Sequence, residues 1–330
     1  MELPSIKQLK SDAAHALRRG REPKTVILWY AGIVTLVAVA ISLLNLSLSS
    51  QIRSTGGLGN LGTRTILSTV QTILPMVNTL AMACLELGYL HAMLRICRGQ
   101  YADQTDLKMG FSKFFPLVRL MAMLMLLGIL IGWFTYQAAF TIFLITPWAN
   151  PLMELAGTLS QGSILDSSMI ITEELAAQAL PAMLPMLLIW MLLLAAVLIP
   201  FSYRTRFASL ALLDEPKGSA FRALMTSFKM TRKQCWKLFK LDLSFWWYYG
   251  LVALATVLGS LDMLLDALGV LLPMNGDFTY YLFYGLYLAA NFAICYFLLN
   301  RVQSTYVMAY ESLREKPVSG GVVLGNIFDV

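Results

Sequence analysis

The chain has 330 residues, of which 58% are hydrophobic and only 13% are charged. Soluble globular domains carry about 25% charged residues, so this composition excludes an ordinary soluble domain and indicates a protein whose solvent is lipid. The net charge is +6, but the basic residues stand beside long apolar runs. The sequence therefore predicts contact with anionic lipid headgroups at the cytoplasmic face, and it predicts no binding of nucleic acid.

Six apolar runs are close to the length of about 20 residues that crosses a bilayer as a helix. In chain order they cover residues 25–48, 66–94, 116–145, 181–202, 241–264 and 280–300. These runs predict an all-α fold, a polytopic membrane helix bundle of six transmembrane helices that occupies residues 25–300.

The basic residues predict how this bundle is oriented. Of the 25 lysines and arginines, 23 lie in alternate connecting segments, namely residues 1–24, 95–119, 204–240 and 301–316. Because positive charge stays on the cytoplasmic side during insertion, both termini are predicted to be cytoplasmic. We expect a basic N-terminal segment, residues 1–24, and a cytoplasmic tail, residues 301–330.

The second apolar run contains the most unusual side chains, Gln71, Asn78 and Glu86. At about 100° per residue these three lie within roughly 80° on one face of a helix. An ionisable group facing lipid is costly, so we expect this face to point into the bundle or into a wet cavity. It forms either a path for an ion or substrate, or a hydrogen-bonding face that holds helices together.

The loop at residues 146–180 contains four acidic residues and neither lysine nor arginine, as expected for an external loop. Residues 171–180 within it are predicted to form a short interfacial helix. On the opposite side, residues 203–240 form a basic amphipathic segment. If residues 218–240 are one continuous helix, its basic side chains within about 40° of each other are candidate contacts to anionic lipid. These are Arg222, Lys229, Lys233 and Lys240.

Catalytic and metal-binding patterns do not occur in the sequence. There is no GxxxxGK[ST] phosphate loop, no GxGxxG after a strand and no GxSxG turn. The four cysteines form no CxxC pair, and neither histidine belongs to a ligand pattern. We therefore expect no cofactor, no metal and no catalytic residue.

One stretch resembles a known family. Residues 203–245 contain a Tyr-rich exit from a span, an Asp-x-Pro turn, and a helix that leads into a Trp-x-Leu-Phe run. The residues that carry the likeness are Asp214, Pro216, Ser227, Trp236, Leu238, Phe239, Ser244 and Phe245. The pattern is similar to a bacterial integral-membrane family numbered nine-seven-five among the domains of unknown function. The segments "MGFSKF" at 109–114 and "STYVMAYESL" at 304–313 resemble the same family.

The resemblance implies a multi-span helical protein of the bacterial plasma membrane, and it implies no activity. Three functions are consistent with the sequence. The first is a nonenzymatic scaffold, regulatory or export-associated membrane protein that works through its basic segments and its acidic loop. The second is a small-solute or ion transporter that uses the polar face of the second span, and the third is a membrane-embedded lipid-modifying enzyme. An unidentified membrane-protein partner is expected for the first.

Overall fold

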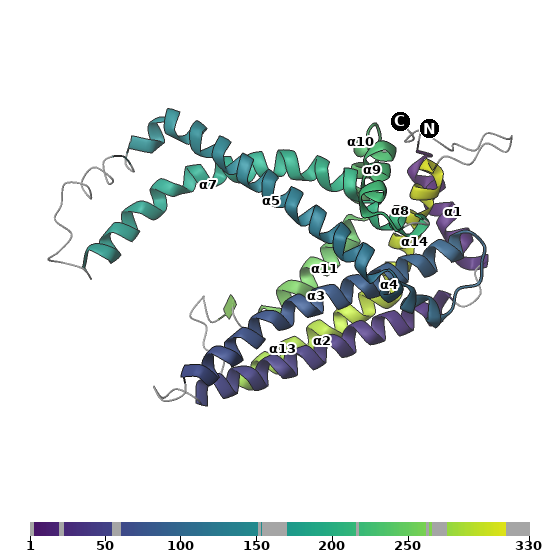
Figure 1. Ribbon diagram of the computed structural model, residues 1–330, viewed down its shortest axis with the longest axis horizontal. Coiled ribbons are helices and arrows are strands. Elements are labelled where there is room, and N and C mark those ends of the chain that lie inside the picture. Colours follow the sequence, from purple (N-terminus) through teal and green to yellow (C-terminus); the bar gives the residue numbers. More distant parts are fainter. Residues whose placement is uncertain are drawn as a thin grey trace. The chain divides into compact units, whose positions relative to one another are not determined.

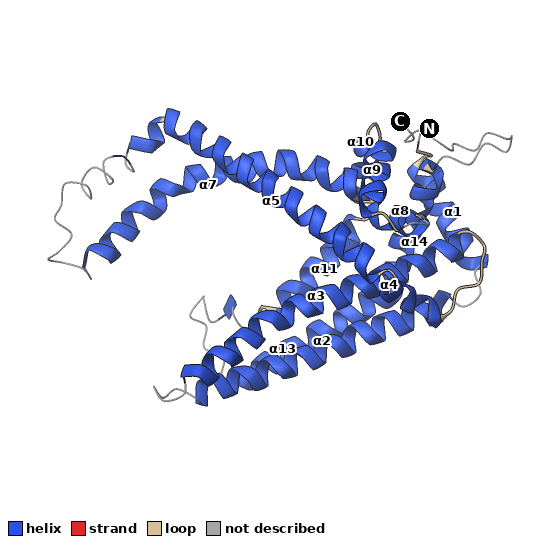
Figure 2. Cartoon of the chain, viewed as in Figure 1, coloured by secondary structure: helices blue, strands red, loops and turns tan. Residues whose placement is uncertain are grey.

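The computed structural model describes residues 3–19, 23–54, 61–150, 153, 170–215, 218–261, 264–265 and 276–314 (Figure 1). Every regular element among these residues is a helix (Figure 2). The prediction of an all-α fold is therefore confirmed.

Five helices are long and apolar enough to cross a membrane. They are Lys24–Ile52, Gly62–Cys97, Phe114–Ile145, Met183–Asp214 and Tyr281–Leu313. A sixth candidate is the pair Cys235–Leu243 and Trp246–Gly259, whose axes meet at a bend of 62°. The chain is thus a multi-pass membrane protein. The fifth predicted span is a broken helix, and the predicted span ends and their orientation stay predictions.

The chain divides into two compact units. Unit 1 comprises Met1–Val118 and Phe207–Val330, and unit 2 comprises Arg119–Arg206. In unit 1, α2 (Pro23–Ser54) packs along α3 (Leu61–Cys97), and α11 (Trp246–Gly259) packs along α13 (Gly276–Ile294). A π-helical segment, η4 (Cys295–Leu299), joins α13 to α14 (Asn300–Leu313).

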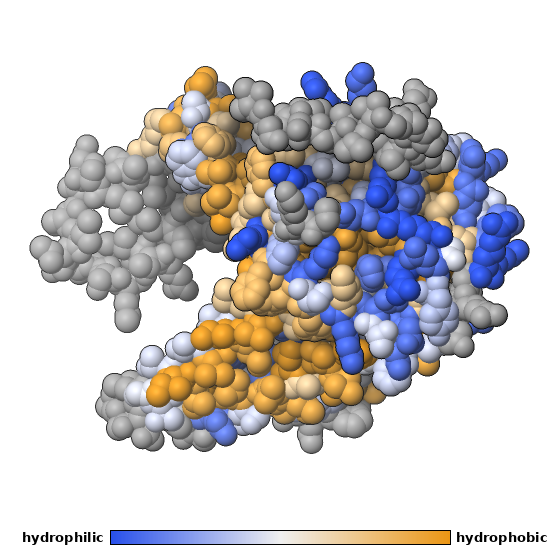
Figure 3. Space-filling model, turned by 45° about the vertical axis from the view of Figure 1, so that its right-hand side comes forward, coloured by the Kyte–Doolittle hydropathy of each residue, from blue (hydrophilic) through white to orange (hydrophobic). Residues whose placement is uncertain are grey.

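Shorter helices surround one end of these long helices, and we call them the short-helix layer. The layer consists of α1 (Ile6–Arg19), η2 (Gln104–Lys108), α4 (Met109–Ser112), α8 (Ala208–Asp214), α9 (Ala220–Thr231) and α10 (Cys235–Leu243). Within it, α1 packs on α14, α8 packs on α9, and both η2 and α4 pack on α3. Hydrophilic residues gather at this end, whereas apolar residues cover the long helices (Figure 3).

The core of unit 1 lies around the C-terminal half of α3. Most side chains of α3 from Cys84 onwards are buried, whereas many in its N-terminal half are exposed. The Tyr89 ring stacks on Tyr30 of α2 with centroids 4.5 Å apart, and its hydroxyl donates to Asn300 Oδ1 at 2.7 Å. One side chain thus connects α2, α3 and α14.

Two glycines permit an unusually close approach between α3 and the short-helix layer. A Cβ atom at Gly110 would overlap the carbonyl oxygen of Cys84 and lie 2.9 Å from the backbone nitrogen of Gly88. A Cβ atom at Gly88 would overlap the backbone of Leu107. Because the obstacles are backbone atoms, they cannot rotate away. The "MGFSKF" segment therefore needs its glycine for packing.

Unit 2 is built from α5 (Phe114–Ile145), η3 (Pro147–Ala149) and α7 (Ile170–Thr205), the first turn of α5 belonging to unit 1. Phe143, Ala149 and Met186 are buried together. The expectation of a separate interfacial helix at residues 171–180 is wrong, because α7 runs without interruption from Ile170. Glu, Leu and Ala, which are strong helix formers, dominate this stretch and extend the helix. Residues 154–169 of the predicted external loop lie outside the described part of the chain.

Candidate functional site

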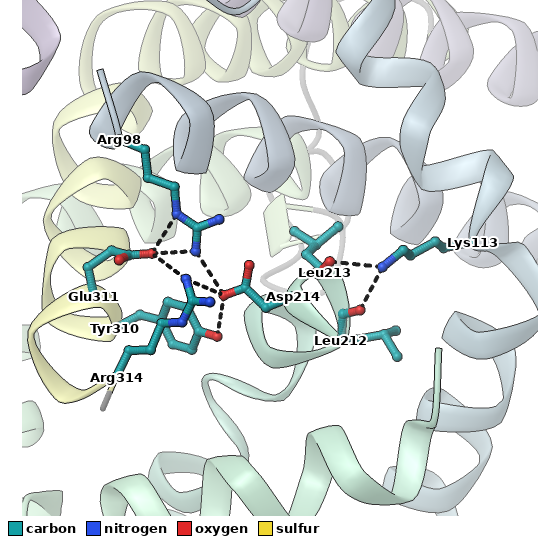
Figure 4. A network of polar contacts seen from close by, with 8 residues as sticks. All are labelled: Arg98, Lys113, Leu212, Leu213, Asp214, Tyr310, Glu311 and Arg314. Atoms are coloured by element: carbon teal, nitrogen blue, oxygen red, sulfur yellow. Dashed lines mark hydrogen bonds and ion pairs between the residues drawn. The ribbon is translucent and has the colours of Figure 1, made fainter. Parts of the chain in front are cut away.

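A network of charged side chains joins three elements of unit 1 at the short-helix layer (Figure 4). The Arg98 guanidinium donates to Asp214 Oδ2 at 2.8 Å and to Glu311 Oε1 at 2.6 Å. The Tyr310 hydroxyl donates to the same Asp214 oxygen at 2.8 Å. Arg314 Nη1 lies 3.3 Å from Asp214 and 3.8 Å from Glu311. Two cations and two anions therefore neutralise each other.

Local structure explains how these side chains meet. Arg98 directly follows α3, and Gly99 turns the chain there with a φ of 74°, a left-handed conformation that favours glycine. Asp214 is the last residue of α8, Tyr310 and Glu311 lie on the last turn of α14, and Arg314 directly follows that helix. Burial lowers the pKa of Arg98, but its hydrogen bonds to Asp214 and Glu311 outweigh burial and raise the pKa above its ordinary value. Arg98 is therefore permanently charged.

Lys113 caps the C-terminus of α8. Its ammonium donates to the carbonyl oxygens of Leu212 and Leu213 at 2.9 and 2.8 Å, which are among the carbonyls that a helix leaves without partners at its C-terminus. Burial lowers the pKa of Lys113, and the nearby Asp214 and Glu215 carboxylates act in the opposite direction. Figure 4 shows Lys113 and the charge network on opposite sides of the same short helix.

A second ion pair fixes the turn that precedes α4. Arg95 Nη1 lies 2.6 Å from Oδ1 of Asp106, which is buried. The Asp106 carboxylate also accepts from the backbone N–H of Asp103, and Asp103 caps η2 in return. His91 Nε2 is 3.8 Å from Asp106. This pair holds η2 and α4 against α3, at the short distance that Gly88 and Gly110 permit.

An open pocket of about 510 Å³ lies beside the charge network, and we call it the platform pocket. Its lining contains four basic side chains and two acidic ones, namely Lys229, Arg232, Lys233, Arg314, Asp214 and Glu215. Asp214 is already neutralised by the network, so the positive charge of α9 and of the turn after it dominates the pocket. Such a site attracts a carboxylate or a phosphate.

The comparison of the chain with protein-family models assigns it to a family. Residues 7–317 match the family described as "Protein of unknown function (DUF975)". The chain belongs to DUF975. No curated protein and no solved structure matches it. The family predicted from residues 203–245 is thus confirmed.

The residues that carry the DUF975 resemblance have distinct structural places. Asp214 belongs to the charge network, and Ser227 of α9 is fully buried. Leu238 is buried in α10, on which Trp236 and Phe239 stack with centroids 5.2 Å apart. Ser244 and Phe245 lie at the break between α10 and α11. Pro216 lies outside the described residues.

The four candidate lipid contacts are not on one helix. The condition of one continuous helix over residues 218–240 fails, because α9 ends at Thr231 and α10 begins at Cys235. The structure places Lys229 and Lys233 at the platform pocket. Arg222 is 3.9 Å from Glu215, whereas Lys240 lies over the Trp236 ring at 5.6 Å. Their contact with lipid stays a prediction.

The polar face of the second span has three different environments. Gln71 Nε2 donates to Ser49 Oγ of α2 at 3.2 Å. Asn78 has a buried Oδ1 that accepts no hydrogen bond within the described part of the chain. Glu86 is exposed on the surface of α3. Gln71 thus hydrogen-bonds α3 to α2, and within the described part of the chain the three side chains share no partner.

Sequence reasoning missed Arg98, Tyr310, Glu311 and Arg314 as members of a site. A partial signal was present, because Tyr310 and Glu311 fall in the closing segment that resembles the family. Arg314 and Glu311 are three residues apart, but the partners of Arg98 and Tyr310 are 96 to 213 residues away in the chain, so no local spacing reveals that pairing.

Proposed function

We propose that this protein is a nonenzymatic scaffold, with a regulatory or export-associated role, in the bacterial inner membrane. Both termini and the short-helix layer face the cytoplasm in this proposal. The observation that supports it best is the platform pocket, a predominantly basic site held on a network of ion pairs. The proposed partner is an acidic segment of another protein.

The charges of the pocket favour an acidic peptide. Lys229, Arg232 and Lys233 are exposed, whereas the acidic Asp214 is engaged by two arginines and a tyrosine. The network also fixes α8 relative to α14, so the pocket is preorganised and little entropy is lost when a ligand binds. Cations presented on a rigid surface speed association with an acidic partner and disfavour basic partners.

Lipid contacts complete the proposal. Trp236 is 65% exposed and lies beneath the Lys240 ammonium. An exposed indole with a neighbouring cation suits the headgroup region of an anionic leaflet. A transporter that uses Gln71, Asn78 and Glu86 is less well supported, because Gln71 already bonds to α2.

Binding of a short fluorescent poly-glutamate peptide to the purified protein tests the pocket. We expect the double variant Lys229→Gln, Lys233→Gln to raise the Kd about tenfold, because two such charges each contribute about 0.7 kcal/mol. The control is Lys7→Gln, Arg19→Gln, which removes the same charge from exposed positions of α1 that do not line the pocket. Equal effects of the two double variants would contradict the proposal. A photo-crosslinking residue at Met230, which lines the pocket, would then identify the cellular partner.

The proposed orientation predicts opposite labelling of two exposed positions. In a chain whose four cysteines are replaced by alanine, Gln104→Cys is expected to react with a membrane-impermeant maleimide only after cells are opened. Asn150→Cys is expected to react in intact cells, because it follows the third span. Both side chains are exposed, so slow reaction through burial is avoided. The reverse pattern would refute the orientation.

A further inference from the structure

A second basic pocket, of about 770 Å³, lies elsewhere in unit 1. Its walls come from α1, the start of α2, the α10–α11 junction, η4 and the first turns of α14. Four cations line it, namely Lys10, Arg18, Lys24 and Arg301. No carboxylate stands among the described residues of its lining. The described lining of the pocket therefore carries a concentrated positive charge.

Lys10, one of the four cations, is held by contacts within the protein. The Lys10 ammonium donates to the carbonyl oxygen of Ser244 at 3.0 Å and lies 4.2 Å from the centroid of the Phe245 ring. These contacts occur where the broken helix bends, so Lys10 binds a carbonyl at the end of α10. Burial lowers the pKa of Lys10. Arg18, Lys24 and Arg301 are exposed, and they are available to a ligand.

Part of the wall of the pocket is aromatic. Tyr296 and Phe297 belong to the π-helical segment η4, and Trp247 belongs to the start of α11. Phe297 is 66% exposed. Single π-helical turns within α-helices are rare and are often retained at functional sites. Here the π-helical turn supplies two aromatic side chains to the same pocket that the cations line.

The pocket lies where long helices end. Lys24 is the first residue of the first candidate span, and Trp247 is the second residue of the second part of the broken one. Aromatic residues favour the interface between hydrocarbon and headgroups, and basic residues favour the anionic surface. A ligand that fits both the basic and the aromatic parts of the lining has a negatively charged head and an apolar body.

We propose that this pocket binds the headgroup of an anionic glycerophospholipid, a phosphodiester without a cationic group, with the acyl chains along the aromatic wall. Arg18, Lys24 and Arg301 contact the phosphate region in this proposal. A zwitterionic lipid fits less well because its ammonium would meet a pocket that already holds four cations. The site is separate from the platform pocket, so its failure would leave the proposed scaffold function standing.

The experiment uses the full chain in detergent and short-chain lipids, with native mass spectrometry and thermal unfolding as readouts. We expect dioctanoyl phosphatidylglycerol to bind and raise the Tm, and dioctanoyl phosphatidylcholine to bind at least tenfold more weakly. Glycerol phosphate, which has the phosphate but no acyl chains, is expected to compete poorly. Full competition by glycerol phosphate would overturn the lipid assignment and indicate a site for a soluble phosphate ester.

Neighbouring arginines of α1 supply a matched control. We expect Arg18→Gln and Arg301→Gln each to weaken phosphatidylglycerol binding about fivefold, the effect of a cation that contributes about 1 kcal/mol. Arg19→Gln removes an exposed charge next to Arg18 that does not line the pocket, and is expected to leave binding unchanged. Phe297→Ala is expected to weaken binding of the lipid but not of glycerol phosphate. Equal binding of the two lipids, or equal effects of Arg18→Gln and Arg19→Gln, would refute the proposal.

Discussion

Replacing Gly110 with alanine is expected to destabilise the protein by about 3 kcal/mol or more, the largest effect we predict for one methyl group. The added Cβ would overlap the Cys84 carbonyl oxygen and crowd the Gly88 nitrogen. Overpacking usually costs about 1–3 kcal/mol when side chains can rearrange, and backbone atoms cannot. Gly88→Ala is expected to act similarly, because its Cβ would overlap the backbone of Leu107. Thermal unfolding and the yield of monodisperse protein in detergent measure both.

The control for this prediction is Gly250→Ala in α11. An added Cβ there meets no heavy atom within 4 Å. Alanine also favours a helix over glycine by up to about 1 kcal/mol, so this variant is expected to be neutral or slightly stabilised. If Gly110→Ala and Gly250→Ala unfold at the same temperature, α4 does not pack on α3 at backbone distance.

Replacing Asp214 with alanine is expected to cost about 2–3 kcal/mol. The change removes a half-buried carboxylate that accepts from Arg98 and Tyr310 and lies 3.3 Å from Arg314. Hydrogen bonds to charged groups contribute about 1.5–3 kcal/mol each, and the partial exposure of this site reduces the total. Asp214→Asn keeps the shape and one acceptor, so an intermediate loss is expected. Chemical or thermal unfolding in detergent measures these differences.

The adjacent acidic residue provides the comparison. The Glu215 carboxylate lies 3.9 Å from the exposed Arg222, its ion-pair partner among the described residues, and such surface pairs contribute about 0–1 kcal/mol. Glu215→Ala is therefore expected to change stability little, although it removes the same charge one residue away. A similar loss for both variants would show that net charge, and not the geometry of the network, sets the stability of this region.

The sequence predicted the parts of the structure that lipid imposes. A helix satisfies its own backbone hydrogen bonds, so a long apolar run in a bilayer must be helical whatever its neighbours are. The apolar runs and the helical class could therefore be derived without coordinates. The DUF975 membership of residues 7–317 also comes from the sequence alone. The orientation was predicted from another local feature, the alternation of basic segments, because positive charge stays on the cytoplasmic side during insertion.

Only the tertiary structure decided which charges meet and where helices break. Arg98 pairs with Asp214 and Glu311, which lie 116 and 213 residues further along the chain, and helical periodicity has no information over such distances. The interruption between Thr231 and Cys235 separates four lysines and arginines that a single helix would have aligned. The need for glycine at positions 88 and 110 likewise depends on a neighbouring backbone. Composition and periodicity thus determine the helices and their solvent, whereas contacts between distant segments determine the two pockets.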